Sequence, residues 1–164
     1  INFQTVGTAR TLVNGGEADI YGSEAGIEFL ATRWLSGFAN ASYQKIGQTF
    51  TGVSRRGGPD WKANVGVRGE WDSGLNGEVA VHYVAGATYP LIELFTLLAP
   101  ALPTPVSQTV ESYTLLNLRG GYRFWHDKAE VAVSVMNALN DRHKEHPLGD
   151  MLGSRVMGWV TIRL

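Results

Sequence analysis

The run His143-Lys144-Glu145-His146 contains the residue types best suited to chemistry in this chain. Imidazole and carboxylate groups are ligands that zinc and nickel accept. The chain has no cysteine, and no third or fourth ligand lies close to this run in the sequence. The run falls between two predicted strands, where polar residues are common. We therefore expect a polar loop here and no metal site.

Catalysis requires a nucleophile with a base beside it, or two carboxylates set apart for acid–base work. The chain contains neither a G-x-S-x-G turn nor such a carboxylate pair. His82, on the polar side of a predicted strand, leaves a hydrolase open as an alternative. We expect no catalytic residue and no cofactor, so the protein is predicted not to be an enzyme.

The segment Ser54-Arg55-Arg56-Gly57-Gly58 could be mistaken for a nucleic-acid-binding patch. It occurs once, in a predicted long loop, and the formal net charge of the chain is −1. Nucleic-acid binding requires a strongly basic surface, so we expect no nucleic-acid partner.

Charged residues recur on one parity of several alternating segments. They admit two interpretations: the charged wall of a water-filled lumen that contacts a plug and a ligand, or cross-strand ion pairs that fix the strand register. We expect cross-strand pairing to account for most of them. The predicted lumen-facing residues are Glu24, Glu28, Lys62, Arg68, Glu70, Arg119 and Arg123.

The elements that carry these residues show period-two alternation, which is typical of β-strands. Several are longer than ordinary strands and match the roughly 9–11 residues that cross a bilayer at a tilt. The predicted strands are residues 1–6, 17–32, 37–46, 60–71, 77–87, 111–124, 129–138 and 155–164. The apolar parity predicts a lipid-facing side made by Ala63, Val65, Val67, Val79, Val81, Leu116, Leu118, Val131, Val133, Val160 and Ile162.

The connections alternate in length. Short ones are predicted at residues 33–36, 72–76 and 125–127, and long ones at 47–59, 88–110 and 139–154. Short turns at one end and long loops at the other are typical of outer-membrane barrels. Asp72-Ser73-Gly74 and Asn76-Gly77 are predicted to supply the positive φ angles of a tight turn. Any helix is expected within residues 90–99.

Tryptophans agree with this arrangement, because Trp34, Trp71 and Trp125 lie at short turns and Trp61 lies near a long loop. Amphipathic rings gather at both interfaces of a membrane. No stretch reaches the roughly 18–20 apolar residues of a membrane helix. The prediction is an all-β fold: an antiparallel up-and-down meander of about eight strands, part of a transmembrane outer-membrane β-barrel.

Two other classes remain open. A complete small eight-stranded outer-membrane barrel with a passive or adhesive role would suit a chain of 164 residues. A soluble β-sandwich is disfavoured, because its core would have to bury Lys62, Arg68 and Arg119 at several kcal/mol of desolvation each.

Three segments carry a resemblance to a known family. Residues 133–142 read VSVMNALNDR, residues 149–164 read GDMLGSRVMGWVTIRL, and residues 14–24 read NGGEADIYGSE. They resemble, in that order, the V-x-N-L-F-N/D-K/R, G-R-x-x-x-G-x-V-T-x-R-F and N-x-G-x-A-x-x-x-G-x-E segments of TonB-dependent receptors. The chain departs from the family in ending on Leu164 instead of Phe, and in Ala138-Leu139 where the family has Leu-Phe.

The resemblance implies that residues 1–164 are the C-terminal segment of a receptor barrel of about 22 strands, with the plug domain absent. It implies energised uptake of a nutrient such as an iron-siderophore, cobalamin or glycan across the bacterial outer membrane. The implied partners are outer-membrane lipid and lipopolysaccharide, the barrel-assembly machinery, TonB through the missing plug, and a small nutrient ligand. It also implies that Val160, Ile162 and Leu164 form the C-terminal assembly signal.

A fragment of a larger barrel should leave its last strand unpaired on one side. The segment 1–6 is too short to pair with ten residues of ladder, so we expect residues 155–164 to form the edge of an open, curved sheet. Continuous pairing between 155–164 and the N-terminal strand would favour the small complete barrel instead.

Overall fold

The structure of the chain is a computed structural model, and it describes residues 2–6, 9–13, 17–50, 53–54, 57–92 and 105–163. Side chains are described for residues 19–47, 57–89 and 108–163. The described residues contain strands, turns and loops and no helix. Among them, no helix is long and apolar enough to cross a membrane.

Three antiparallel sheets make up the described structure. The main sheet has the order β12-β11-β10-β7-β6-β4-β3, with β5 paired to β4, while β1 pairs with β2 and β8 pairs with β9. The strands are β1 Asn2–Val6, β2 Ala9–Val13, β3 Glu17–Leu30, β4 Leu35–Phe50, β5 Val53–Ser54, β6 Trp61–Glu70, β7 Leu75–Val84, β8 Ala87–Ile92, β9 Pro105–Val110, β10 Tyr113–Phe124, β11 Ala129–Met136 and β12 Arg155–Ile162.

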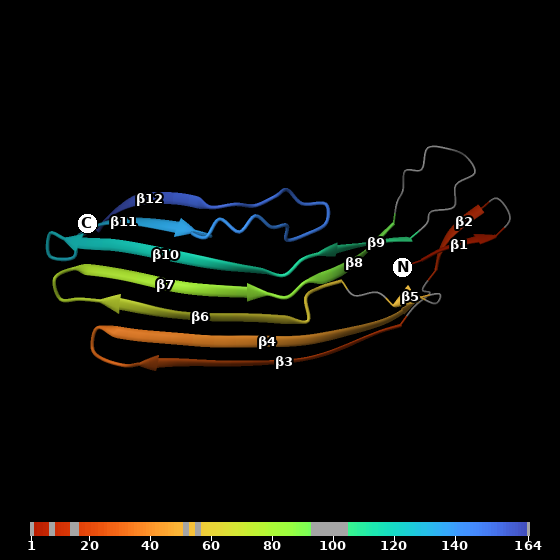
Figure 1. Cartoon of the computed structure of the whole chain (residues 1–164), viewed down its shortest axis with the longest axis horizontal. Coiled ribbons are helices and arrows are strands. Elements are labelled where there is room, and N and C mark those ends of the chain that lie inside the picture. The colour runs from red at the N-terminus through yellow and green to blue at the C-terminus, as the bar shows by residue number, and fades with distance from the viewer. Residues whose placement is uncertain are drawn as a thin grey trace.

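Neighbours in the main sheet follow chain order, so the predicted antiparallel meander is confirmed. The three short turns, β3–β4, β6–β7 and β10–β11, lie together at one end of the sheet (Figure 1). The β11–β12 loop lies toward the other end, together with β5 and the β8–β9 and β1–β2 hairpins (Figure 1). The sheet therefore has a turn end and a loop end, as predicted.

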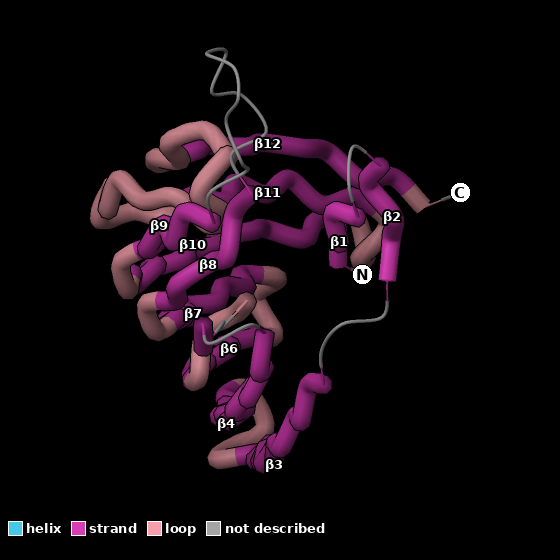
Figure 2. Tube along the Cα trace, turned by 90° about the vertical axis from the view of Figure 1, so that its right-hand side faces the viewer, coloured by secondary structure: helices cyan, strands magenta, loops and turns pink. Residues whose placement is uncertain are grey.

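The main sheet is open and curved (Figure 2). Its two edges among the described residues are β12 and β3, and β1 pairs with β2 rather than with β12. The prediction that the last strand forms an edge is confirmed. The continuous pairing that would favour a small closed barrel is not found in the described residues.

Several predicted boundaries were wrong. Residues 88–110 were predicted to be a loop, but β8 and β9 extend the β7–β10 connection as a hairpin in register from Ala87↔Val110 to Ile92↔Pro105. The hairpin tolerates Pro90 and Pro105 because each strand of a two-stranded sheet is an edge strand. Of the helix expected within 90–99, residues 90–92 belong to β8 and the rest lies outside the described residues.

The β6–β7 turn is tighter than predicted. It comprises residues 71–74, where Gly74 has a φ of +89° and its N–H donates to the Trp71 carbonyl at 2.9 Å. Asn76 and Gly77 were predicted to be turn residues, but both lie inside β7. The turn needs one residue with positive φ, and Gly74 supplies it without steric cost.

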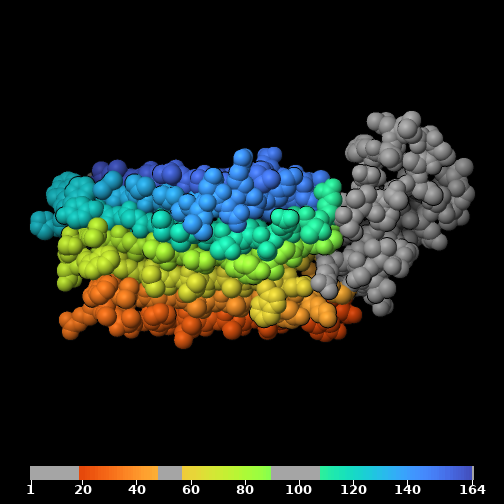
Figure 3. Space-filling view, viewed as in Figure 1, coloured from red at the N-terminus to blue at the C-terminus, as the bar shows by residue number. Residues whose placement is uncertain are grey.

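The eleven residues predicted to face lipid share one side of the sheet, because the register pairs them with one another, as in Val65↔Val81 and Val131↔Val160. We call this side the apolar face. Eight of them are between 36% and 65% exposed, and Ala63, Val81 and Leu116 are half-buried. They do not pack into a closed interior. The space-filling view shows the strands as parallel bands along one elongated surface (Figure 3).

The opposite side, which we call the polar face, is the better buried of the two at several positions. Ala80 and Ala132 are 3% and 2% exposed, and Asn76 is also buried. A soluble protein buries its large apolar side chains and exposes its polar ones. In this sheet the valine, leucine and isoleucine side chains of one face are exposed, whereas several positions of the polar face are buried.

Candidate functional site: the polar face and the β11–β12 loop

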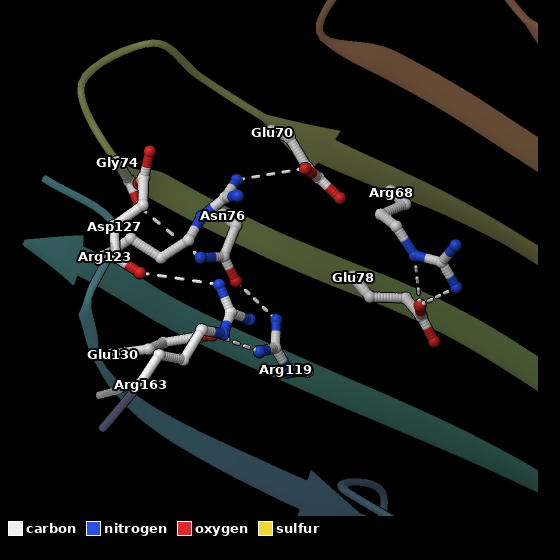
Figure 4. A network of polar contacts seen from close by, with 10 residues as sticks. All are labelled: Arg68, Glu70, Gly74, Asn76, Glu78, Arg119, Arg123, Asp127, Glu130 and Arg163. Carbon is white, nitrogen blue, oxygen red and sulfur yellow. Dashed lines mark hydrogen bonds and ion pairs between the residues drawn. The ribbon is translucent and has the colours of Figure 1, made fainter. Parts of the chain in front are cut away.

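All seven residues predicted to face the lumen belong to the polar face. The pairing register places them in rows that cross several strands, for example Arg68↔Glu78↔Arg119 and Glu24↔Ser42↔Lys62. Four of the seven, Arg68, Glu70, Arg119 and Arg123, form ion pairs, and these are drawn in Figure 4. Glu24, Glu28 and Lys62 make no hydrogen bond or ion pair with the residues that the structure describes.

Two of the ion pairs connect neighbouring strands, and the third joins β10 and β6, which lie on either side of β7. Arg68 donates to Glu78 Oε2 from both Nε, at 2.9 Å, and Nη2, at 2.6 Å. Arg123 Nη2 lies 3.0 Å from Glu70 Oε2 and joins β10 to the end of β6. These contacts support the interpretation of the charges as cross-strand pairs that fix register.

Arg119 forms the best-buried of these pairs. Its Nη2 donates to Glu130 Oε1 and its Nη1 donates to Asn76 Oδ1, so one guanidinium links β7, β10 and β11 (Figure 4). The guanidinium also lies 5.6 Å from the centre of the Trp159 ring. A Cβ at Gly121 would lie 2.7 Å from Asn76 Oδ1 and 2.9 Å from Glu130 Oε1. Because Gly121 has no Cβ, the side chains of Asn76 and Glu130 can occupy the space beside it.

A second polar row contains no ion pair. Asn64 Nδ2 donates to Asn40 Oδ1 at 2.6 Å, and His82 Nδ1 lies 2.5 Å from Asn64 Oδ1. An amide oxygen can only accept, so His82 Nδ1 is the donor in this contact. Asn40, Asn64 and His82 therefore form a hydrogen-bonded ladder across β4, β6 and β7.

The loop between β11 and β12, residues 137–154, is held by its own polar side chains. Asn137, with a φ of 52°, donates from Nδ2 to the Asp141 carbonyl at 2.9 Å, and its Oδ1 accepts from the Asp141 N–H at 3.0 Å. Asp141 Oδ2 accepts from the Thr114 N–H at 3.2 Å, which ties the loop to β10. Asn140 Oδ1 accepts from the Ser154 N–H at 3.0 Å and closes the base of the loop.

His143 is buried in this loop, as are Asn137 and Pro147. Its ring stacks on Tyr113 with 4.0 Å between ring centres, and its Nδ1 lies 2.8 Å from the Asp141 carbonyl oxygen. His146 instead packs edge-on against Tyr89 at 5.1 Å. The two histidines of the run therefore serve different contacts. No group of three or more His, Cys, Asp or Glu residues in the described part of the chain is placed to hold a metal ion.

Sequence reasoning missed the partners of the predicted charges. Glu78 and Glu130 complete two ion pairs, and Asn76 completes the Arg119 cluster. All three have the parity of the polar face, and this signal could have identified them. Val160 and Ile162 of the predicted assembly signal are exposed on β12, whereas Leu164 lies outside the described residues. Of the segment Ser54–Gly58, residues 55 and 56 also lie outside them.

The comparison with protein families matches this fold. Residues 1–138 match the family described as "TonB dependent receptor-like, beta-barrel". The match includes all of the motif at residues 14–24 and residues 133–138 of the motif at 133–142, while the motif at residues 149–164 lies beyond it. No curated protein and no solved structure is significantly similar to the chain. The matched region covers most of the 164 residues. The chain therefore belongs to the TonB-dependent receptor-like β-barrel family, whose members are transporters, not enzymes, of the bacterial outer membrane that act with TonB.

Proposed function

We propose that residues 1–164 are the C-terminal segment of a receptor barrel for energised uptake of a nutrient such as an iron-siderophore, cobalamin or glycan. The observation that carries this proposal is the inverse distribution of side chains over the sheet. Exposed valine, leucine and isoleucine cover one face, and ion-paired arginine and glutamate cover the other. Such a sheet suits lipid on one side and a polar lumen on the other.

The aromatic residues support a membrane position for the apolar face. Trp34 and Trp71 stack at 5.5 Å at the turn end, and Tyr43 and Trp61 lie 4.8 Å apart at the loop end. Trp61 and Trp71 are ten residues apart in the sequence. Ten residues of strand span about 33 Å, which a tilt of about 40° reduces to a height of about 25 Å. That height equals the apolar band of an outer-membrane barrel.

The open edges support assignment of the chain to a larger barrel. An unpaired backbone group in hydrocarbon costs several kcal/mol, so β3 and β12 require further strands beside them in a membrane. In this proposal those strands and the plug that contacts TonB belong to the rest of the receptor. The barrel-assembly machinery would act on the β12 segment, and lipopolysaccharide would surround the loop end.

The positions of the apolar and polar faces relative to the lipid are tested with cysteine substitutions on β6. In a receptor otherwise free of cysteine, Val65→Cys and Lys62→Cys are labelled with a small fluorophore in lipid vesicles. We expect acyl-chain-brominated lipid to quench the label at residue 65 and aqueous iodide to quench the label at residue 62. Quenching of the residue 65 label by iodide alone would refute the lipid-facing assignment.

Transport is tested in cells. A strain that lacks the gene encoding this chain is compared with its parent for uptake of radiolabelled iron-siderophores, cobalamin and glycans. We expect loss of uptake in one of these classes, and the same loss when TonB is removed. Uptake that continues without TonB would refute energised transport and would favour a passive barrel.

A further inference from the structure

Three charged side chains of the polar face take no part in the cross-strand ion pairs. They are Glu24 and Glu28 on β3 and Lys62 on β6, the two strands that flank β4. All three are exposed, and none has a hydrogen bond or ion pair to a described residue. The other four lumen-facing charges are accounted for by ion pairs. Register therefore leaves the charged groups of Glu24, Glu28 and Lys62 available to a ligand.

A hollow of about 430 Å³ lies on the polar face over β4, and Glu24 and Lys62 line it from opposite sides. The pairing register places Ser42 between them, in the row Glu24↔Ser42↔Lys62. Two strand spacings separate the backbones of Glu24 and Lys62 by roughly 10 Å. The volume falls within the range of small-molecule sites. A ligand over Ser42 would thus meet a carboxylate on one side and an ammonium group on the other.

Asn40 and Asn64 form the next row of the same hollow, beside Gly26. The hydrogen bonds from Asn64 Nδ2 to Asn40 Oδ1 and from His82 Nδ1 to Asn64 Oδ1 fix the orientation of both amides. An amide nitrogen carries two hydrogens, so Asn40 Nδ2 and Asn64 Nδ2 retain hydrogens for a further acceptor. Gly26 has no side chain, which keeps the hollow open on the β3 side.

Phe38 adds an aromatic ring one row closer to the turn end. It is half-buried, and it lines the next hollow along β4, of about 320 Å³, together with Glu28 and Arg68. A Cβ at Gly66 would lie 2.6 Å from Phe38 Cζ, so the tip of the ring rests against the bare backbone of β6. A ligand that extends along β4 would therefore meet polar groups first and an aromatic ring next.

A polyhydroxylated ligand matches this set of groups. Each hydroxyl donates one hydrogen and also accepts, so the same kind of group serves Glu24, which only accepts, and Lys62, which only donates. The C–H groups of a sugar ring can pack on the apolar surface of Phe38. A ferric chelate presents mainly acceptor oxygens around the metal. Those oxygens would suit Lys62 but would face the carboxylates of Glu24 and Glu28.

We infer that the two hollows over β4 bind a short neutral oligosaccharide. Its hydroxyl groups bind Glu24 and Lys62, its oxygens accept from the amides of Asn40 and Asn64, and one sugar ring packs on Phe38. The inference rests on the proposed transport function, because it selects glycan from the nutrient classes named there.

The test measures binding to the purified full-length receptor by calorimetry. The probes are neutral trisaccharides of glucose, mannose, galactose, xylose, arabinose and N-acetylglucosamine, with trigalacturonate, ferrichrome and cyanocobalamin for comparison. We expect at least one neutral trisaccharide to bind at least tenfold tighter than each of the three comparison probes. Binding of no neutral trisaccharide, or tightest binding by a comparison probe, overturns the inference.

Variants then locate the site. Glu24→Gln and Lys62→Met should each weaken binding of that trisaccharide at least fivefold, and Ser42→Trp should abolish it by filling the hollow. The matched controls are Glu111→Gln and Lys128→Met, at exposed residues outside both hollows, and they should leave affinity unchanged. Folding of each variant is checked by mobility on unheated gels. Glu24 contacts no described residue, so unchanged affinity in Glu24→Gln overturns the inference even if Ser42→Trp misfolds.

Binding and cellular uptake are measured separately, so either proposal can fail alone. Uptake that requires TonB but is confined to an iron-siderophore or cobalamin would overturn the oligosaccharide inference and leave energised transport intact. Oligosaccharide binding that depends on Glu24 and Lys62, with uptake that continues without TonB, would refute energised transport and support the binding site.

Discussion

Replacement of Arg119 by methionine should destabilise the barrel more than loss of any other cation in the ion pairs described above. Arg119→Met retains much of the apolar stem but removes the donors to Asn76 and Glu130. Those two groups are then left poorly paired, since Asn76 is buried and the Glu130 side chain is 14% exposed. Hydrogen bonds to charged groups contribute about 1.5–3 kcal/mol each. Because Arg119 is one-third exposed, we expect a total loss of about 3 kcal/mol, at the lower end of that sum.

A double-mutant cycle separates the pair from the rest of the cluster. Arg119→Met combined with Glu130→Gln should give a coupling energy of about 2 kcal/mol, within the range for contacting residues. The matched control is Arg123→Met with Glu70→Gln, a pair whose glutamate side chain is 55% exposed. Exposed pairs contribute about 0.2–1 kcal/mol, so the control coupling should lie below 1 kcal/mol.

The assay is equilibrium unfolding in urea of the full-length receptor in lipid vesicles, followed by tryptophan fluorescence and by mobility on unheated gels. Raising the salt to about 1 M should reduce the coupling of the exposed control pair more than that of Arg119–Glu130. Equal coupling in the two cycles, or a coupling below 0.5 kcal/mol for Arg119–Glu130, would refute the assignment of Arg119 as the centre of the cluster.

Three further predictions follow from single positions. Val65→Arg should cost about 2–4 kcal/mol in vesicles by the same urea assay. Its control is Glu24→Arg on the opposite face, at a residue without a hydrogen bond or ion pair to a described residue, and it should cost less than about 1 kcal/mol; equal costs would contradict the faces. Gly74→Ala should cost at least about 2 kcal/mol, because φ is +89° and the new Cβ would lie 2.1 Å from a carbonyl oxygen of β10. Gly120→Ala, whose Cβ meets nothing within 4 Å, is its control and should cost under about 1 kcal/mol. Asn137→Gly keeps the positive φ but loses two hydrogen bonds, so amide exchange in residues 137–154 should accelerate roughly tenfold or more; unchanged exchange would show that other contacts hold the loop.

Much of the fold could be predicted from local pattern. Alternation assigned residues to faces, and the alternation of connection lengths assigned turns and loops to opposite ends. These signals are strong because side-chain direction in a strand has a period of exactly two residues. Strand ends were predicted less well. β7 begins at Leu75 rather than at residue 77, since Gly74 alone completes the turn. The β8–β9 hairpin was missed because its residues carry proline and lack clean alternation.

The charged residues show where local pattern is insufficient. Parity placed Arg119 on the polar face. Its contacts with Glu130 and Asn76, however, depend on the register of β10 with both β11 and β7. A shift of the register by two residues would keep every side chain on its face and change every partner. The open edge of β12 was foreseen because residues 1–6 are too short to cover it.

The amino-acid sequence by itself determined the strand-rich class, the two faces, the order of the strands and the family, because these depend on residue type and near-neighbour spacing. Only the tertiary structure decided the ion-pair partners, the burial of His143 and its stack on Tyr113. His143 and Tyr113 are thirty residues apart in sequence, yet their rings stack at 4.0 Å. That contact exists because the meander returns the β11–β12 loop to the start of β10. Such long-range proximity is set by the packing of whole strands, which no short stretch of residues specifies.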